Sequence, residues 1–399
     1  MKKSLIALAA LASVAGVAQA QSSVTLSGNI DLGMHSLKNT FTDGTDTVTR
    51  KQTGPNGNGA ASWTSSAIGI DVKEDLGSGM RAGYSAAMNL SSFGASADLA
   101  TQLLGTGRHS YAFVGGNFGE LRIGYQYVLE DQISGGIGRA SPTGNIAGRI
   151  HNYSFAFGET VSAASPAGAL TSGAFTRGNM VEYSSPVMGG LQVIGQWGKV
   201  TDDLTTTVVA GANAGEADAQ LFAIGAKYSA GALNLGMSYQ TVDSKAQTIG
   251  AASTTTRSDT DRTTWTFGGN YDFKVAKVFA SYGTRKNETT GNVPASFANL
   301  TTTANELKRD GWDLGATVPV GANVTLTANY GQGSWKYTQG GDTTKFDVDA
   351  YQVAATYALS KRTSATVFYG MAKASGDTAD VANSEIKNTQ YGFGLRHTF

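Results

Sequence analysis

Charged side chains at alternating positions are the residues in this sequence whose types and spacing could do chemistry. Asp71, Lys73, Arg108, Arg122 and Glu182 each fall on the polar side of a segment whose other side is apolar. Fixed charges of both signs that face one another across a narrow passage create a field that selects ions by sign. These residues therefore predict ion selection, provided that the segments carrying them enclose a passage.

The sequence lacks the patterns of a catalytic or metal centre. Cysteine is absent, which excludes disulfides, zinc–thiolate sites and thiol nucleophiles. The serine-rich segments contain no local Ser/His/acid constellation, and the glycines near residues 54–59 do not follow a strand–helix pattern that would cradle phosphate. No pair of histidines has metal-ligand spacing: His35, His109, His151 and His397. We expect no enzymatic activity, no metal and no cofactor.

Composition and the first residues place the chain among exported proteins. Basic and acidic residues number 30 each, so no global charge favours nucleic acid. Lys2 and Lys3 precede an apolar run over residues 5–17, and Ala18-Gln19-Ala20 matches a cleavage site. This arrangement predicts a signal peptide over residues 1–20. Residues 21–399 then form the mature domain.

The remaining chain alternates between apolar and polar residues with the period of a β-strand. In the first such segment Val24, Leu26 and Ile30 share one face, while Thr25 and Asn29 share the other. Similar segments follow up to the C-terminus, and their length of about 9–14 residues exceeds the usual strand length. A tilted strand of about 9–11 residues crosses a bilayer.

Short and long connections alternate between these segments. There are seven short connections and eight long ones. These 15 connections link 16 strands. The short ones lie near residues 75–79, 116–119, 185–189, 230–231, 272–275, 319–322 and 359–362, and the long ones near 37–61, 92–105, 128–177, 200–217, 243–260, 285–308, 333–346 and 373–388. This layout predicts an all-β fold, a 16-stranded antiparallel transmembrane β-barrel with short periplasmic turns and long external loops. A soluble β-sandwich is the alternative, but it would not explain the regular alternation.

The polar faces of the strands predict a water-filled lumen. If the apolar faces meet lipid, the opposite faces must line the inside of the barrel, and at 16 strands the inside is an aqueous channel. The aromatic residues mostly share the lipid-facing parity, Tyr111 and Phe113 among them, with Phe279 and Phe368 as exceptions. The inward set is too polar for a dry core: Thr25, Asn29, Asp31, Asp71, Lys73, Arg108, Arg122, Glu182, Gln192, Gln196, Asn234, Gln240, Asn270, Asp313, Asn329 and Gln352.

The third long connection, residues 129–176, is a candidate for a constriction inside the lumen. Loops of more than about 12–15 residues are usually functional or disordered, and this one carries the acids Glu130, Asp131 and Glu159. We predict that it folds inward and that Arg108 faces these acids across the opening. A solvated surface loop is the alternative.

The chain also resembles the trimeric general porins of β-proteobacteria, the neisserial and Burkholderia-like type. The matching stretches occur in the family's order from residue 22 to residue 399: Ser22-Ser23-Val24-Thr25-Leu26, Glu74-Asp75-Leu76-Gly77, Gly107-Arg108, Asn117-Phe118-Gly119, Tyr271-Asp272-Phe273, Val275-Ala276-Lys277-Val278, Pro319-Val320-Gly321-Ala322, Ala358-Leu359-Ser360-Lys361-Arg362-Thr363 and Gly394-Leu395-Arg396-His397 with Phe399. The resemblance implies a homotrimer in the bacterial outer membrane, in contact with its lipids and lipopolysaccharide. It also implies passive diffusion of ions and small hydrophilic solutes, a constricting third loop, and a terminal Phe399 that the barrel-insertion machinery reads.

Several positions depart from the resembled family. Ala67, Asp71, Tyr125 and Glu182 stand where the family often has a basic residue, and Arg177 lies near a family arginine but has outward parity. With four basic positions missing, the sequence favours weak or cation selectivity. A substrate-specific channel is the second candidate function and would need aromatic residues along the lumen. An outer-membrane enzyme or adhesin is the third.

Overall fold

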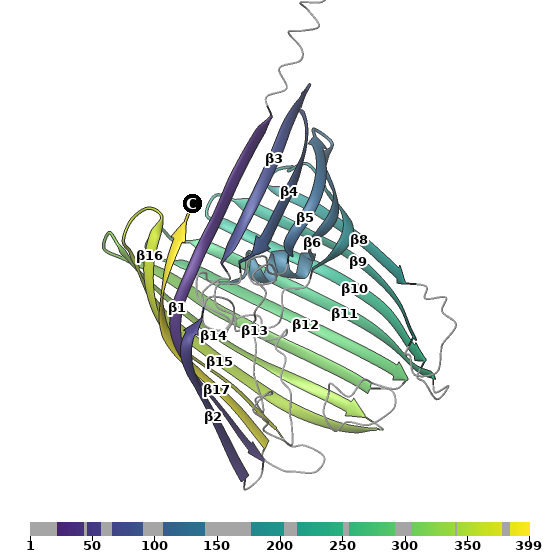
Figure 1. Ribbon diagram of the computed structural model, residues 1–399, viewed down its shortest axis with the longest axis vertical. Helices are drawn as coiled ribbons and strands as arrows, with labels where there is room; N and C mark the ends of the chain where they lie inside the picture. The colour runs from purple at the N-terminus through teal and green to yellow at the C-terminus, as the bar shows by residue number, and fades with distance from the viewer. Residues whose placement is uncertain are drawn as a thin grey trace, which may run out of the picture.

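The strands of the mature chain form one continuous antiparallel sheet. The computed structural model describes residues 22–43, 46–56, 66–90, 107–139, 177–202, 214–249, 255–291, 305–339, 341–376 and 384–399. Within these ranges it contains 17 strands and one short π-helical turn (Figure 1): β1 Ser23–Asp43, β2 Asp46–Asn56, β3 Ala67–Gly77, β4 Met80–Asn89, β5 Gly107–Gly116, β6 Gly119–Tyr127, η1 Asp131–Gly135, β7 Arg177–Ser184, β8 Leu191–Asp202, β9 Ala214–Ala230, β10 Leu233–Ile249, β11 Thr255–Asp272, β12 Lys277–Gly291, β13 Asn305–Val320, β14 Val324–Gln339, β15 Asp342–Ala358, β16 Thr363–Gly376 and β17 Ser384–Thr398.

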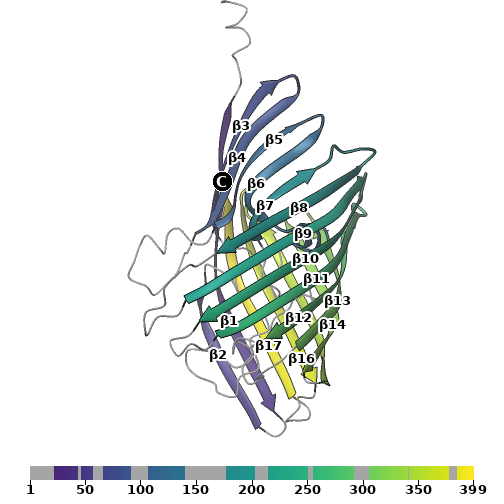
Figure 2. The ribbon, with the colours of Figure 1, turned by 90° about the vertical axis from the view of Figure 1, so that its right-hand side faces the viewer.

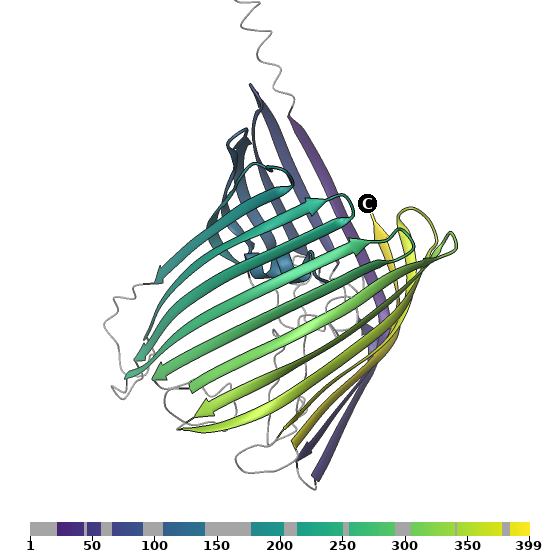
Figure 3. The same ribbon diagram turned by 180° about the vertical axis from the view of Figure 1, so that it is seen from behind.

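The sheet closes on itself through β1. One edge of β1 pairs with β17, from Asn29 opposite Thr398 onward. Its other edge pairs with β3 near the start of the strand and with β2 along the rest. β2 and β3 therefore share one place in the ring, so the 17 strands occupy 16 places. The predicted 16-stranded antiparallel barrel is confirmed, and the strands surround a common axis in all three views (Figures 1, 2 and 3).

The two ends of the barrel carry different connections. The seven predicted short turns all join neighbouring strands, and they lie at the same end as the start of β1 and the C-terminus (Figure 1). In the β3–β4 turn, Gly77 and Gly79 have φ of 79° and 77°, a backbone conformation that glycine adopts without steric cost. Most residues of the connections at the opposite end lie outside the described ranges.

The strands at that opposite end are longer than predicted. β9 to β17 have 14 to 18 residues each, although about 9–11 would cross the bilayer. The predicted loops at residues 37–61 and 333–346 are largely strand, and this part of the prediction is wrong. The reason is that paired threonines continue the strands beyond their apolar residues, as in Thr338 with Thr343, whose hydroxyls lie 3.0 Å apart. β-Branched residues favour strands even when they are polar.

The inward parity of β5 also differs from the prediction. Tyr111 pairs with the buried Ser85, and the Arg122 guanidinium lies 5.1 Å from the Tyr111 ring centroid inside the barrel. Tyr111 and Phe113 therefore point inward. Arg108 nevertheless faces inward as predicted, because the register shifts beside it: Ala87 pairs with His109, and Met88 with Gly107. This bulge inserts one residue and re-aims the side chain.

Polar side chains line the inside, and apolar side chains cover the outside. The buried polar residues include nine of the predicted inward set: Asn29, Asp31, Glu182, Gln196, Gln240, Asn270, Asp313, Asn329 and Gln352. Leu314, Leu326 and Phe393 are among the exposed apolar residues of the outer face. In the described ranges, no helix has the length and apolar character needed to cross a membrane.

Candidate functional site

The third long connection begins inside the ring of strands. After β6 the chain turns back through Val128, whose carbonyl accepts from the Asp131 and Gln132 amides at 3.1 and 3.2 Å. Leu129, Glu130 and Ile133 are fully buried, and η1 contacts β10, β11 and β12. Residues 129–139 therefore lie against the inner wall (Figure 1), as predicted for the start of this connection. Its remainder, which includes Glu159, lies outside the described residues.

Two wall glycines make room for this segment. A Cβ on Gly236 would lie 2.9 Å from Ile137 Cδ1, and a Cβ on Gly268 would lie 2.9 Å from the Ile133 carbonyl oxygen. Real Cβ atoms do not approach backbone atoms so closely, so a side chain on Gly268 would displace the segment. The Asn270 side-chain amide donates to the Ile137 carbonyl at 2.8 Å and adds a second attachment. We refer to Gly236 and Gly268 as the glycine seat.

A buried ion pair fixes the same segment to β12. The Arg285 Nη2 atom lies 2.8 and 2.7 Å from the two carboxylate oxygens of Glu130. The Glu130 side chain is 0% exposed and the Arg285 side chain 10% exposed. Charge-assisted hydrogen bonds of this kind are roughly twice as strong as neutral ones. The pair joins residues 155 positions apart in the chain. It therefore attaches the start of the third connection to β12.

Arg285 belongs to a cluster of three arginines on neighbouring strands, which we call the arginine cluster. Arg285 on β12 and Arg309 on β13 are directly opposite in register. Arg262 on β11 donates through Nε to Asn287 Oδ1 at 3.3 Å, and Asn287 is two residues from Arg285. The Arg309 guanidinium lies 4.7 Å from the Trp335 ring centroid, a cation–π contact that orients it. Three positive groups thus gather on the wall beside Glu130.

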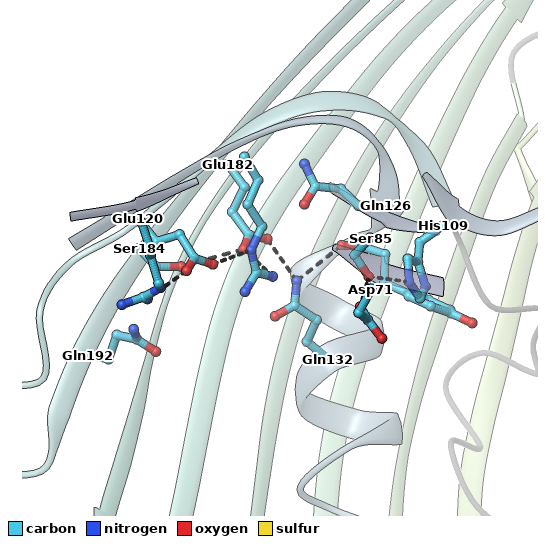
Figure 4. A network of polar contacts seen from close by, with 12 residues as sticks. Asp71, Ser85, His109, Glu120, Gln126, Gln132, Glu182, Ser184 and Gln192 are labelled. Atoms are coloured by element: carbon cyan, nitrogen blue, oxygen red, sulfur yellow. Dashed lines mark hydrogen bonds and ion pairs between the residues drawn. The ribbon is translucent and has the colours of Figure 1, made fainter. Parts of the chain in front are cut away.

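A second polar network surrounds Glu182, nearer to the turn end (Figure 4). Its carboxylate accepts from Gln196 at 2.6 Å and from Gln132 at 2.9 Å. Arg122 Nη1 lies 3.2 Å away and also binds Glu120, through its Nε at 2.7 Å. Glu182 is only 1% exposed, so these partners are needed to keep a charged carboxylate inside the protein.

A third group joins Asp71, Ser85 and His109 (Figure 4). The Ser85 hydroxyl donates to Asp71 Oδ1 at 2.6 Å and lies 2.9 Å from His109 Nε2. The single hydroxyl proton points at the carboxylate, so His109 must donate to Ser85. A base that activates a serine must instead accept the serine proton. The group therefore lacks the arrangement of a hydrolase.

The predicted site residues fall into several places. Asp71, Arg108, Arg122 and Glu182 lie on the inward side, as does Lys73, which is exposed near the turn end. Glu130 binds Arg285, and Arg108 donates to Asn89 Oδ1 at 2.6 Å. The opposition of Arg108 to Glu130, Asp131 or Glu159 across the opening stays a prediction.

Two further predicted residues also have clear positions. Asp131 is 4% exposed in η1. Arg177 has the outward parity of Tyr127, and its guanidinium lies 4.6 Å from that ring centroid. It therefore belongs to the barrel wall rather than to either lumen network.

Sequence reasoning missed the arginine cluster. Arg285 fell in the predicted loop at residues 285–308, and Arg309 came directly after it. A signal was available, because Arg309, Gly311 and Asp313 alternate in phase on the inward side of β13. Extending the strands through their polar ends would have found all three arginines. In the part of the chain that the structure describes, no three His, Cys, Asp or Glu side chains are placed to hold a metal ion.

Comparisons with known proteins agree with this architecture. The family model described as Gram-negative porin matches residues 7–377. An outer membrane porin protein of Bordetella pertussis is 27% identical over the full length of both chains. Outer membrane porin protein 32 of Delftia acidovorans is 29% identical over 91% of this chain and 87% of its own. Among solved structures, the anion-selective porin from Comamonas acidovorans is similar in fold, with a TM-score of 0.61 at 22% identity over 95% of this chain and all of its own.

Proposed function

Because the chain belongs to the Gram-negative porin family and forms a general diffusion channel in the outer membrane, we propose that its arginine cluster gives the channel a preference for small anions. The observation that carries this proposal is the placement of Arg262, Arg285 and Arg309 on one side of the lumen, where Glu130 binds Arg285. Three of these four charged groups are positive, which favours anions at this point of the wall. This proposal replaces the weak or cation selectivity that the sequence favours.

The cluster acts on ions through its field rather than by binding them. A unit charge about 8 Å from an ion contributes about 0.5 kcal/mol even at the dielectric constant of water. The energy is favourable for an anion and unfavourable for a cation, so the difference of about 1 kcal/mol changes the ratio of anion to cation permeability roughly fivefold. A narrow passage with low-dielectric walls strengthens the field further, while solutes continue to diffuse freely.

The reversal potential in a salt gradient tests the proposal. Arg262→Gln and Arg309→Gln should each move the reversal potential of single channels in a planar bilayer toward cation preference, by about a fivefold change in permeability ratio. Arg362→Gln is the matched control. Arg362 lies in the short turn between β15 and β16, at the turn end of the barrel, and does not belong to the arginine cluster. A wild-type channel that prefers cations, or variants that match the control, would contradict the proposal.

The inward aromatic residues do not favour a substrate-specific channel. Trp335, Phe346 and Phe368 belong to one cluster on the inner wall and are 3%, 6% and 8% exposed. A track that guides sugars must present its rings to the passing solute. Buried rings stabilise the wall instead, so general diffusion is the better explanation.

We also propose that residues 1–20 are a cleaved signal peptide, that the porin is a homotrimer in contact with outer-membrane lipids and lipopolysaccharide, and that Phe399 is needed for assembly. Phe399 exchanges two backbone hydrogen bonds of 3.1 Å with Gly28, at the place where β1 meets the C-terminus. Its ring lies against the Gly28 backbone, where a Cβ would clash.

Deleting Phe399 should therefore lower the amount of folded barrel in the outer membrane several-fold while export remains intact. Immunoblotting of membrane fractions, with and without heating, measures folded and unfolded protein. Phe399→Tyr keeps the ring and both backbone bonds, so it should retain assembly. Equal amounts of folded deletion variant and wild type would count against the role of Phe399.

A further inference from the structure

A second charged site lies between η1 and the periplasmic turns, away from the arginine cluster. The structure has a cavity there of about 460 Å³, which is lined by β4, β6, β7, β8 and β9 together with the segment at residues 185–187. Volumes of about 300–1,000 Å³ are typical of small-molecule sites. The charged residues that line the cavity are Arg81, Glu120, Arg122, Glu182 and Lys227.

The two carboxylates of the cavity already have partners. Glu120 binds both Arg81 and Arg122, each at 2.7 Å. Glu182 accepts from Arg122, Gln132, Gln196 and Ser184 and is 1% exposed. Each carboxylate therefore already forms an ion pair with an arginine. Three cations against two carboxylates leave the cavity with a net charge of +1.

Lys227 is the cation of the cavity that binds no carboxylate directly. Its ammonium group donates to the Gln132 side-chain oxygen at 2.7 Å, and no carboxylate of the described residues lies within ion-pair distance of it. The Gln132 amide is held in place, because its nitrogen donates to Glu182 at 2.9 Å and to the Tyr127 carbonyl at 3.1 Å. A lysine has three donors, so two donors of Lys227 remain for another group.

We propose that this cavity is a transient binding site for a small oxyanion, a carboxylate or a phosphate, on the periplasmic side of the channel. Lys227 supplies the unpaired charge, and the half-exposed Arg81 and the partly exposed Arg122 supply further donors. The neutral Gln132 positions Lys227 without cancelling its charge. The inference rests on the proposed function in one respect: an oxyanion reaches the cavity through the lumen of the diffusion channel.

Block of the chloride current tests the site. With the folded protein in a planar bilayer, sodium phosphate and sodium acetate are added to each side in turn, at constant chloride and ionic strength. We expect a saturable fall in single-channel chloride conductance, with a lower half-blocking concentration from the periplasmic side. Lys227→Gln should raise that concentration at least about tenfold, because a charge-assisted hydrogen bond is lost, whereas Lys227→Arg should restore block.

Lys277→Gln is the matched control. Lys277 lies on the inward side at the same end of the barrel, 5.2 Å from the Phe279 ring centroid, and does not line the cavity. This control removes the same charge and should leave block unchanged. Block by phosphate alone, or by acetate alone, identifies which oxyanion the site takes. Absence of saturation, or equal half-blocking concentrations in wild type and Lys227→Gln, would overturn the proposal.

The reversal potential separates this proposal from the proposed function. It reports the arginine cluster and is measured in chloride alone, without an added oxyanion. A cation-preferring wild type that still shows Lys227-dependent block would contradict the role of the cluster and support the site. An anion-preferring wild type without such block would support the role of the arginine cluster and contradict the oxyanion site.

Discussion

Replacing Glu130 by glutamine is expected to lower the stability of the folded barrel by about 3–5 kcal/mol, the usual effect of breaking a buried ion pair. Arg285 would remain buried beside Arg262 and Arg309 without the carboxylate that now binds it at 2.7 Å. The same change removes one negative charge from the lumen, so anion preference should also rise. The temperature at which folded protein loses its gel mobility measures stability, and the reversal potential measures selectivity.

The double variant Glu130→Gln with Arg285→Gln distinguishes the pair from its separate charges. It leaves the net charge of the wall unchanged, so the reversal potential should return toward the wild-type value. Most of the lost stability should also return, since Arg285 is then no longer a buried cation that has lost its carboxylate. Asp347→Asn is the control, because it breaks an exposed pair with Lys345, whose side chains are 62% and 52% exposed. Such pairs contribute about 0–1 kcal/mol, and a Glu130→Gln variant as stable as this control would disprove the role of the buried pair.

Gly268→Ala is expected to reduce conductance by moving the start of the third connection into the lumen. The added Cβ would lie 2.9 Å from the Ile133 carbonyl oxygen and 3.2 Å from Gly138 Cα. Both are backbone atoms, so they cannot rotate away as a side chain could. Overpacking of this kind costs about 1–3 kcal/mol. Single-channel chloride conductance and the unfolding temperature measure the two effects.

Gly178→Ala is the matched control for the glycine seat. Gly178 also faces inward, but a Cβ there would meet only Met180 Cε at 3.6 Å, an ordinary contact. Conductance and stability should remain at wild-type values. If Gly268→Ala matched Gly178→Ala in both measurements, the seat would not determine where the third connection lies.

The strands and the polarity of the lumen could be predicted from the sequence, because alternation is a local signal. Asn270 and Gln352 were placed inward on parity alone, and both are buried there. The predicted inward and outward faces were wrong at β5, where one extra residue beside Arg108 shifts the register. No pattern in the local sequence indicates this bulge. Strand ends were also missed, since threonine favours strands as the apolar β-branched residues do, and charged residues such as Lys336 and Lys345 lie within them.

The partners within the site were not predictable in the same way. Glu130 and Arg285 are 155 residues apart, so only the closed barrel brings them together. The glycine seat is equally hidden in the sequence. Gly268 occupies an inward position of an alternating strand, like many other residues. Its role arises only because Ile133, from another part of the chain, packs against it.

The pairing of β1 with β17 has a consequence for the time course of folding. Asn29 pairs with Thr398, 369 residues further along the chain, whereas the other neighbours in the ring are close in sequence. Hairpins between nearby strands can form early, but this last pairing must wait for the whole chain and must overcome a large loop-closure entropy. Until then both outer strands present unpaired backbone groups, which invite pairing with other chains. The rate at which these two strands find each other, rather than the rate of hairpin formation, should therefore set how long the chain remains prone to aggregation.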